Sequence, residues 1–203
     1  MERFVRRLAA LAVALGIFGC AHLSGDSRWT TLVDGDKGLE NFDRLGDANW
    51  RAEGGAIVAD QAKDTSYLVT RTSYRDFQVR AEFWADHTTN SGIFIRIQDP
   101  KKVGSANSYE VNIYDRRPDP SYGTGAIVDF AKVSPMPTAG GKWNTFVITA
   151  KGSNLKVELN GVQTVNIDND KFPSGPFALQ FGNGPNNAPG GAIKWRKVQV
   201  RPL

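Results

Sequence analysis

Apolar and polar residues alternate in three successive segments between Asp76 and Asp115. Side chains on a β-strand point alternately to opposite faces, so each segment predicts a strand with one apolar and one mostly polar face. The apolar positions are Phe77, Val79, Ala81 and Phe83, then Ile93, Ile95 and Ile97, then Tyr109, Val111 and Ile113. If the three strands are neighbours, the intervening residues share one surface, made of Arg80, Glu82, Trp84, Arg96, Glu110 and Asn112.

That shared surface has two interpretations. Carboxylates, arginines, an amide and aromatic rings on one sheet face suit the binding of a sugar. An ordinary solvated outer face shows the same alternation, so the pattern alone leaves both interpretations open.

The rest of the chain continues in short strand-like segments with almost no helical periodicity. The turn residues Gly54-Gly55 and Asn160-Gly161 predict two tight hairpins, because these residues tolerate positive φ angles. Many short strands with closely spaced turns predict an all-β antiparallel sandwich or barrel, and residues 29–203 are expected to form a single domain. The further strands are expected at Thr30–Val33, Trp50–Glu53, Ala56–Ala59, Tyr67–Thr70, Ala126–Phe130, Thr145–Ala150, Leu155–Leu159, Val162–Ile167, Phe177–Phe181 and Ile193–Val200.

Residues 1–20 are expected to be a secretory signal peptide. A basic start precedes an apolar run over residues 8–18, which is too short to span a bilayer as a helix. The run ends in Phe18-Gly19-Cys20, which resembles a bacterial lipobox, although Phe18 stands where a small residue is usual. Lipidation of Cys20 would place the protein in the periplasm or on the outer membrane as a lipoprotein; ordinary cleavage nearby is the alternative. Residues 21–28 would form a short polar tether.

Charge and composition exclude several classes of function. The net charge is +4, but the chain after residue 20 carries 22 basic and 20 acidic side chains, which gives no reason to expect nucleic acid as a partner. Membrane contact is expected only through the N-terminal lipid anchor. Cys20 is the only cysteine, so the domain has no disulfide and no cysteine nucleophile, and His87 is its only histidine after the tether. No cofactor is indicated, while an all-oxygen site for a divalent metal stays open.

The loops around the third segment are further candidates for binding groups. The segment at residues 116–124 carries two prolines, which would stiffen it and hold Tyr122, Arg116 and Arg117 over the sheet. A rigid surface connection is the alternative. On the third strand itself, Asp115 lies at odd spacing from Glu110 and faces away, so the acid-and-nucleophile pair of ordinary glycosidases is missing there.

Several blocks of sequence, spread over the whole body from about Trp29 to Pro202, resemble the 3-keto-disaccharide hydrolase domain family. The blocks are LVDG at 32–35, WRAEGG at 50–55, YRDFQVRAEF at 74–83, NSGIFIR at 90–96, YEVNIYD at 109–115, GTGAI at 123–127, GKWNT at 141–145 and LQFG at 179–182. The resemblance implies a concanavalin-like jelly-roll sandwich of two antiparallel sheets, bacterial export, and action on oxidised sugars.

The chemistry implied by the resemblance needs one base, a group that stabilises an enolate oxygen, and groups that orient the sugar. We expect Glu110 to be the general base, Glu82 a second carboxylate or metal ligand, and Arg96 the enolate stabiliser. Hydroxyl groups of the sugar would be bound by Asn90, Asn112 and Gln180. Rings that could stack on the sugar are Trp84, Tyr122 and Trp143.

One departure from the family pattern keeps a second function open. Many members have an acidic residue and a histidine after the Leu-Gln of the late strand, whereas this chain reads Leu179-Gln180-Phe181-Gly182-Asn183. The leading interpretation is an exported hydrolase or lyase that cleaves 3-keto glycosides. The alternative is a non-catalytic carbohydrate-binding or envelope-associated module on the same sandwich.

Overall fold

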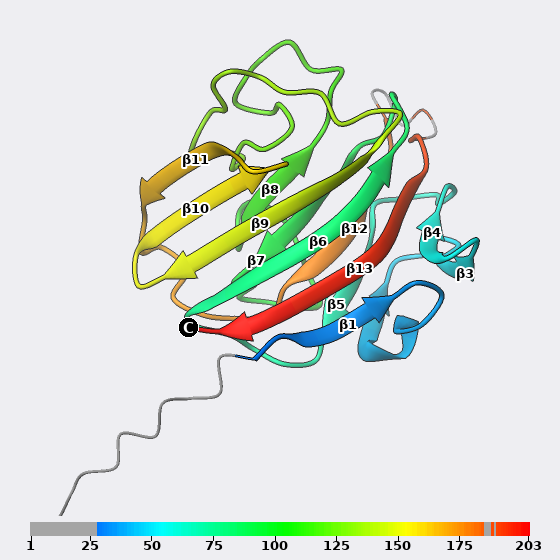
Figure 1. The fold of residues 1–203 in the computed structure, drawn as a ribbon, viewed down its shortest axis with the longest axis horizontal. Helices are drawn as coiled ribbons and strands as arrows, with labels where there is room; N and C mark the ends of the chain where they lie inside the picture. Colours follow the sequence, from blue (N-terminus) through cyan, green and yellow to red (C-terminus); the bar gives the residue numbers. More distant parts are fainter. Residues whose placement is uncertain (1–27, 185–187, 189) are drawn as a thin grey trace, which may run out of the picture.

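The structure is a computed structural model that describes residues 28–184, 188 and 190–203. Two antiparallel sheets pack face to face (Figure 1). We name the larger one sheet A; its strands, in spatial order, are β11 (Val162–Asp168), β10 (Asn154–Leu159), β9 (Trp143–Lys151), β6 (Phe77–Ala85), β13 (Ile193–Pro202), β4 (Ala56–Ala59) and β3 (Arg51–Glu53), and β1 (Thr30–Asp34) pairs with β13. Sheet B contains β2 (Phe42–Leu45), β5 (Ser66–Thr70), β12 (Ala178–Phe181), β7 (Ser91–Ile95) and β8 (Tyr109–Ile113).

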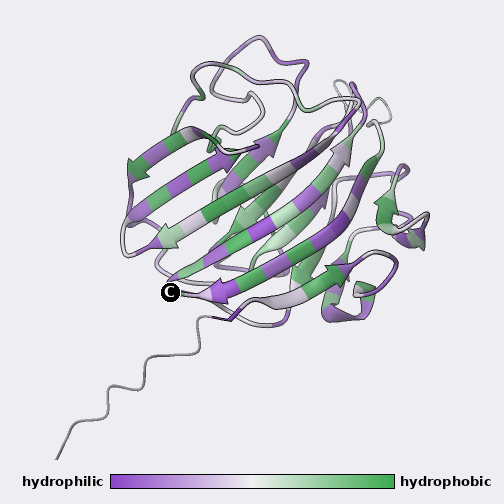
Figure 2. Cartoon of the chain, viewed as in Figure 1, coloured by the Kyte–Doolittle hydropathy of each residue, from purple (hydrophilic) through white to green (hydrophobic). Residues whose placement is uncertain are grey.

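The core lies between the two sheets and contains most of the apolar residues of the alternating segments, such as Phe77, Phe83 and Ile93. Apolar and polar residues alternate along the long strands of sheet A (Figure 2). The rings of Phe83 on β6 and Phe146 on β9 stack with their centroids 5.0 Å apart, and Trp195 on β13 lies 5.7 Å from Phe83. Fully burying a large apolar side chain contributes roughly 1.5–3 kcal/mol, so this alternation is what drives the sheets together.

The all-β sandwich expected from the sequence is confirmed, and most of its strands are found. β2 was not predicted, because its sequence Phe-Asp-Arg-Leu has two polar residues in succession and shows no alternation. The strand expected at Ala126–Phe130 is wrong as a strand: Ile127 forms an isolated bridge with Val111, and the chain then turns at Asp129, whose φ is 68°. A three-residue 3-10 helix spans Leu39–Asn41.

Both predicted hairpin turns have the required backbone. Gly54 and Gly55 have φ angles of 61° and 78°, and Asn160 and Gly161 have φ angles of 52° and 81°. These values match the type I′ turn, whose twist suits the flanking strands. The β3–β4 and β10–β11 pairs are closed by these turns.

The idea that the three central segments share a surface is wrong. Strands β7 and β8 are neighbours in sheet B, but β6 lies in the middle of sheet A. The chain crosses from one sheet to the other between Ala85 and Ser91, so the polar faces of β6 and β8 point outward on opposite sides of the sandwich. Alternation fixes which residues face the core, but it does not say which sheet a strand joins.

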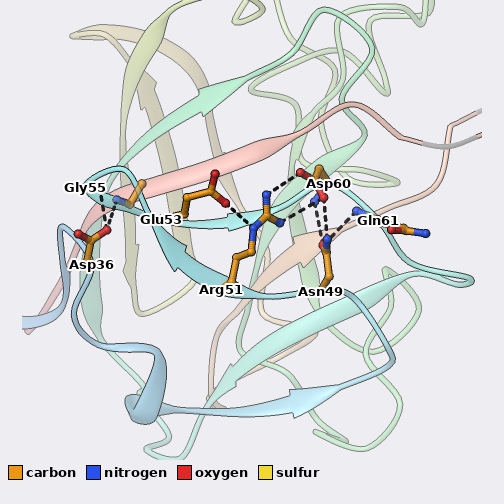
Figure 3. A network of polar contacts seen from close by, with 8 residues as sticks. Asp36, Asn49, Arg51, Glu53, Gly55, Asp60 and Gln61 are labelled. Atoms are coloured by element: carbon orange, nitrogen blue, oxygen red, sulfur yellow. Dashed lines mark hydrogen bonds and ion pairs between the residues drawn. The ribbon is translucent and has the colours of Figure 1, made fainter.

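A polar network at the β3–β4 edge shows how charged residues are used structurally (Figure 3). The Arg51 guanidinium donates to both oxygens of Asp60, at 3.2 and 2.8 Å, and to Glu53. The side chain of Asn49 also donates to Asp60, at 2.7 Å. The hydrogen bonds from Arg51 and then from Asn49 lower the pKa of Asp60. These groups bind one another and hold the hairpin.

The predicted leader and tether are almost wholly outside the described residues, which begin at Arg28; Cys20 is therefore not described. In the part of the chain that the structure does describe, no helix has the length and hydropathy needed to cross a membrane.

Candidate functional site

The outer face of sheet B is the setting of the candidate site. Cross-strand pairing places Val69, Ala178, Phe94 and Glu110 in one row from β5 to β8. A second row contains Tyr67, Gln180 and Asn112, with Gly92 on β7 opposite Asn112. A Cβ atom at Gly92 would lie 2.9 Å from the Val111 carbonyl oxygen, so a side chain does not fit there, and the floor stays open between Gln180 and Asn112.

A polar pocket of about 580 Å³ lies over the β7–β8 side of this face. We call it the Glu110 pocket. It brings together five of the residues that the sequence proposed for the site, Asn90, Glu110, Asn112, Tyr122 and Gln180, and adds the two loop arginines Arg116 and Arg117. The other lining residues are Ser105, Tyr114, Val128, Asn183 and Gly184.

Glu110 is the group in this pocket with the strongest electrostatic perturbation. Its side chain is half-buried at the outer edge of β8, where the backbone N–H of Val128 donates to its carbonyl oxygen at 3.0 Å. Loss of solvent raises the pKa of its carboxyl to about 7, and the negative charge of Asp129 acts in the same direction. Arg117 opposes the shift. A carboxylate with a pKa near neutrality can take up and release a proton under physiological conditions.

The proline-containing loop forms a wall of the pocket, as the sequence suggested. Asn112 donates its side-chain N–H to the carbonyl of Tyr122 at 2.5 Å, and the Arg117 guanidinium lies 4.1 Å from the centre of the Tyr122 ring. Asp115 anchors the base of this loop: it accepts hydrogen bonds from the Thr124 hydroxyl and from the backbone N–H groups of residues 139 and 140. Asp115 is therefore a structural anchor, and it is not among the residues that line the Glu110 pocket.

The side-chain amides of the pocket differ in whether they already form hydrogen bonds within the protein. Asn90 donates to the carbonyl of Asn183 at 2.7 Å, which ties β7 to the loop after β12. The Gln180 Oε1 atom is buried and accepts no hydrogen bond from the described residues. Buried polar atoms are nearly always paired, so an oxygen of this kind at the pocket floor suits a hydroxyl donor supplied by a ligand.

Arg96 does not belong to the pocket, contrary to the sequence-based hypothesis. It follows β7 with a φ of 54°, which turns its side chain into the protein, where it is 1% exposed. Its guanidinium donates to the backbone carbonyls of Arg75 and Gly152 at 2.7 and 2.9 Å, and contacts Asp76 at 3.4 Å. A guanidinium held by carbonyls at that end of the sandwich cannot stabilise an enolate near Glu110.

Glu82, Trp84 and Trp143 are also outside the pocket, because β6 and β9 belong to sheet A. Glu82 forms an ion pair with Arg196 at 2.6 Å. Trp84 and Trp143 lie opposite each other on the outer face of sheet A, and their rings are contacted by Lys194 and Arg196 at 4.8 and 4.4 Å. Glu82 cannot act with Glu110 on one sugar ring from the opposite face of the protein.

The sequence did not reveal Asp129, whose charge influences Glu110. Its position was assigned to the strand expected at Ala126–Phe130, and an isolated Asp before a Phe carries no recognisable motif. For the metal that was left open, no group of three or more His, Cys, Asp or Glu side chains within residues 28–184, 188 and 190–203 is arranged to hold an ion.

Comparison with known proteins identifies the family to which this chain belongs. The family model of the 3-keto-α-glucoside-1,2-lyase-like domain matches residues 28–201 of the sequence. The chain therefore belongs to this family, which confirms the resemblance seen in the sequence and links the protein to carbohydrate chemistry. No curated protein sequence matches it.

Three solved structures illustrate the fold. A protein of Parabacteroides distasonis ATCC 8503, described as a candidate glycosyl hydrolase, is 22% identical, with 87% of this chain and 100% of that chain covered and a TM-score of 0.69. The carbohydrate-binding module CBM66 of Bacillus subtilis is 16% identical, with coverages of 85% and 94% and a TM-score of 0.55. The lumenal domain of VIP36, bound to Ca²⁺ and Man3GlcNAc, is 9% identical, with coverages of 85% and 88% and a TM-score of 0.61. At these identities the likeness shows the fold alone.

Proposed function

We propose that the Glu110 pocket is the active site of an enzyme that cleaves 3-keto glycosides. The observation that carries this proposal is the half-buried Glu110 carboxylate, with a pKa of about 7, on the floor of a polar pocket that also contains two arginines. Membership of the 3-keto-α-glucoside-1,2-lyase-like family supports this substrate class. The sugar-related descriptions of the structural neighbours, CBM66 and VIP36 among them, support a carbohydrate ligand.

The reaction begins with removal of a proton. A ketone at C3 makes the hydrogen at C2 acidic, and Glu110 takes this proton as the general base. The electron pair of the broken C2–H bond forms an enolate, whose negative oxygen would be stabilised by Arg117 or Arg116, in place of the Arg96 suggested by the sequence. Gln180 and Asn112 would orient the ring through its hydroxyl groups.

Cleavage follows from the enolate. The C3 carbonyl re-forms, a double bond forms between C1 and C2, and the C1–O bond breaks. The leaving alkoxide takes a proton from solvent, and Glu110 later returns its own proton to solvent. Addition of water to the unsaturated ketone would complete a net hydrolysis. This route needs one carboxylate, in agreement with the absence of a second one facing Glu110 on β8.

The direct test compares a 3-keto disaccharide with its unoxidised parent as substrates of residues 21–203. We expect release of the leaving sugar from the keto compound only, because only the ketone acidifies C2. Binding of either sugar without turnover would contradict the enzymatic function and would support the alternative, a non-catalytic carbohydrate-binding module. Equal turnover of both would contradict the keto-dependent mechanism.

The raised pKa of Glu110 predicts a particular pH dependence. Only the unprotonated carboxylate can accept the C2 proton, so kcat/KM should rise with pH through about 7 and level off above it. In Asp129→Asn the neighbouring negative charge is removed, so the pKa of Glu110 falls and the rise moves to lower pH; Asn tolerates the positive φ at this position. The measurement is the pH profile of kcat/KM for both proteins. A profile that Asp129→Asn leaves unmoved would count against Glu110 as the titrating base.

We further propose that the protein is exported and anchored through a lipid on Cys20, which rests on the leader-like pattern of residues 1–20. When the full chain is expressed in bacteria with a radiolabelled fatty acid, the protein should take up label and Cys20→Ser should not. Label retained in Cys20→Ser would disprove this anchor.

A further inference from the structure

A second pocket adjoins the Glu110 pocket, and Tyr122 lines both of them. It has a volume of about 390 Å³. We call it the Asp129 pocket. Its polar lining consists of Asp119, Ser121, Asp129 and Lys132, and its aromatic lining of Tyr122 and Phe130. The proposed reaction at Glu110 makes no use of Asp119, Ser121, Lys132 or Phe130.

The two pockets are direct neighbours. Tyr122 lines both of them. The consecutive residues Val128 and Asp129 line the first and the second pocket respectively, and the charge of Asp129 acts on the Glu110 carboxyl. A group attached to a ring above Glu110 can therefore enter the Asp129 pocket along Tyr122.

The lining of the Asp129 pocket suits a ring that carries several hydroxyl groups. Asp119 and Asp129 offer carboxylate acceptors, and the exposed Lys132 offers an ammonium donor. Phe130 supplies an apolar surface, and its ring is fixed by edge contacts with Tyr109 and Phe172, at centroid distances of 4.9 and 6.0 Å. Aromatic surface next to charged hydrogen-bonding groups matches the two kinds of surface on a sugar, namely C–H faces and hydroxyl edges.

A third and larger pocket, of about 770 Å³, is too remote to bind the adjoining group. It lies across β2 and β5 and is lined by Asp43, Val69, Arg71, Ile97 and Lys101, among others. Val69 lies three strands from Glu110 in the same row, which is about 14 Å at the usual strand spacing. Phe94 and Ala178 occupy the row between them.

We propose that the Asp129 pocket binds the leaving sugar of the substrate, and that Lys132 and Asp119 in this pocket contact that sugar. The inference rests on the proposed function, since it assumes that the ring to be cleaved lies over Glu110. It makes Lys132 and Asp119 the residues that distinguish a leaving sugar from a small leaving alcohol.

The test compares a 3-keto disaccharide with the methyl 3-keto glycoside of the same keto sugar. In Lys132→Met, the ratio of kcat/KM for the disaccharide to kcat/KM for the methyl glycoside should fall about tenfold. Lys101→Met is the matched control: it makes the same change in the remote pocket, and the ratio should keep its wild-type value. An unchanged ratio in Lys132→Met, or an equal fall in both variants, would overturn the proposal.

A binding measurement separates this proposal from the enzymatic one. In a Glu110→Gln background, the Kd of the intact 3-keto disaccharide should rise about tenfold on addition of Lys132→Met. If the wild-type protein cleaves neither substrate but the Kd still rises, the Asp129 pocket is supported as a sugar-binding subsite and the enzymatic function is contradicted. If the wild type is active and the Kd does not change, only the role of the Asp129 pocket in binding the leaving sugar is contradicted.

Discussion

Glu110→Gln should lower kcat/KM for a 3-keto disaccharide by about 10²–10⁴-fold, the range that a general base typically contributes. Gln has nearly the shape of Glu, but its amide cannot accept the C2 proton. The pocket should keep its shape, because no described residue donates a hydrogen bond to the Glu110 carboxylate that would hold it in place. Steady-state kinetics above pH 8, where Glu110 of the wild type is ionised, give the cleanest comparison.

Glu82→Gln is the matched control for this prediction. It makes the same chemical change on the outer face of sheet A, where Glu82 contacts Arg196. Activity should stay within about twofold of the wild type, since the loss of a surface ion pair contributes little. If Glu82→Gln abolished turnover and Glu110→Gln did not, the location of the active site on sheet B would be wrong.

Arg96→Ala should be strongly destabilising and is the second large effect that we expect. The substitution leaves the carbonyls of Arg75, Gly152 and Phe172 without the guanidinium that they bind. A hydrogen bond donated by a charged group contributes about 1.5–3 kcal/mol, and the buried guanidinium donates to three carbonyls, so the free energy of unfolding should fall by at least about 3 kcal/mol. For a domain of this size the midpoint of thermal unfolding should fall by roughly 6–12 °C.

The neighbouring arginine provides the control for stability. Arg75→Ala removes an exposed side chain but keeps the backbone carbonyl that Arg96 binds, so its melting temperature should stay near that of the wild type. Thermal unfolding followed by circular dichroism measures both variants. An Arg96→Ala protein with wild-type stability but no activity would restore Arg96 to the catalytic role that the sequence suggested.

The sequence predicts the sandwich well because alternation is a local property. Each strand must bury one face, so Phe83 and Phe146 could be assigned to the core from their own segments. The sheet that a strand joins depends on contacts far along the chain. That is why the polar positions of β6, among them Glu82 and Trp84, could be called outward-facing and still be assigned to the wrong surface.

Only part of the candidate site could be predicted, because strand alternation does not determine which sheet a strand joins. Asn90, Glu110 and Asn112 lie on the paired strands β7 and β8 or at their ends, so reasoning about neighbouring strands was sound for them. Arg96 could not be placed, because alternation assumes extended backbone and its positive φ turns the side chain inward. The effect of Asp129 on the pKa of Glu110 depends on the turn after Ile127, and no local sequence pattern predicts that turn.

The fate of the hydrogen at C2 distinguishes proton removal by Glu110 from direct hydrolysis. A 3-keto disaccharide carrying deuterium at C2 of the keto sugar is turned over in ordinary water, and the products are analysed by mass spectrometry; the same substrate labelled at C1 is the control. Proton removal by Glu110 predicts that the product loses the C2 deuterium completely and keeps the C1 deuterium. A released keto sugar that retains its C2 deuterium would show direct hydrolysis and would contradict proton removal by Glu110.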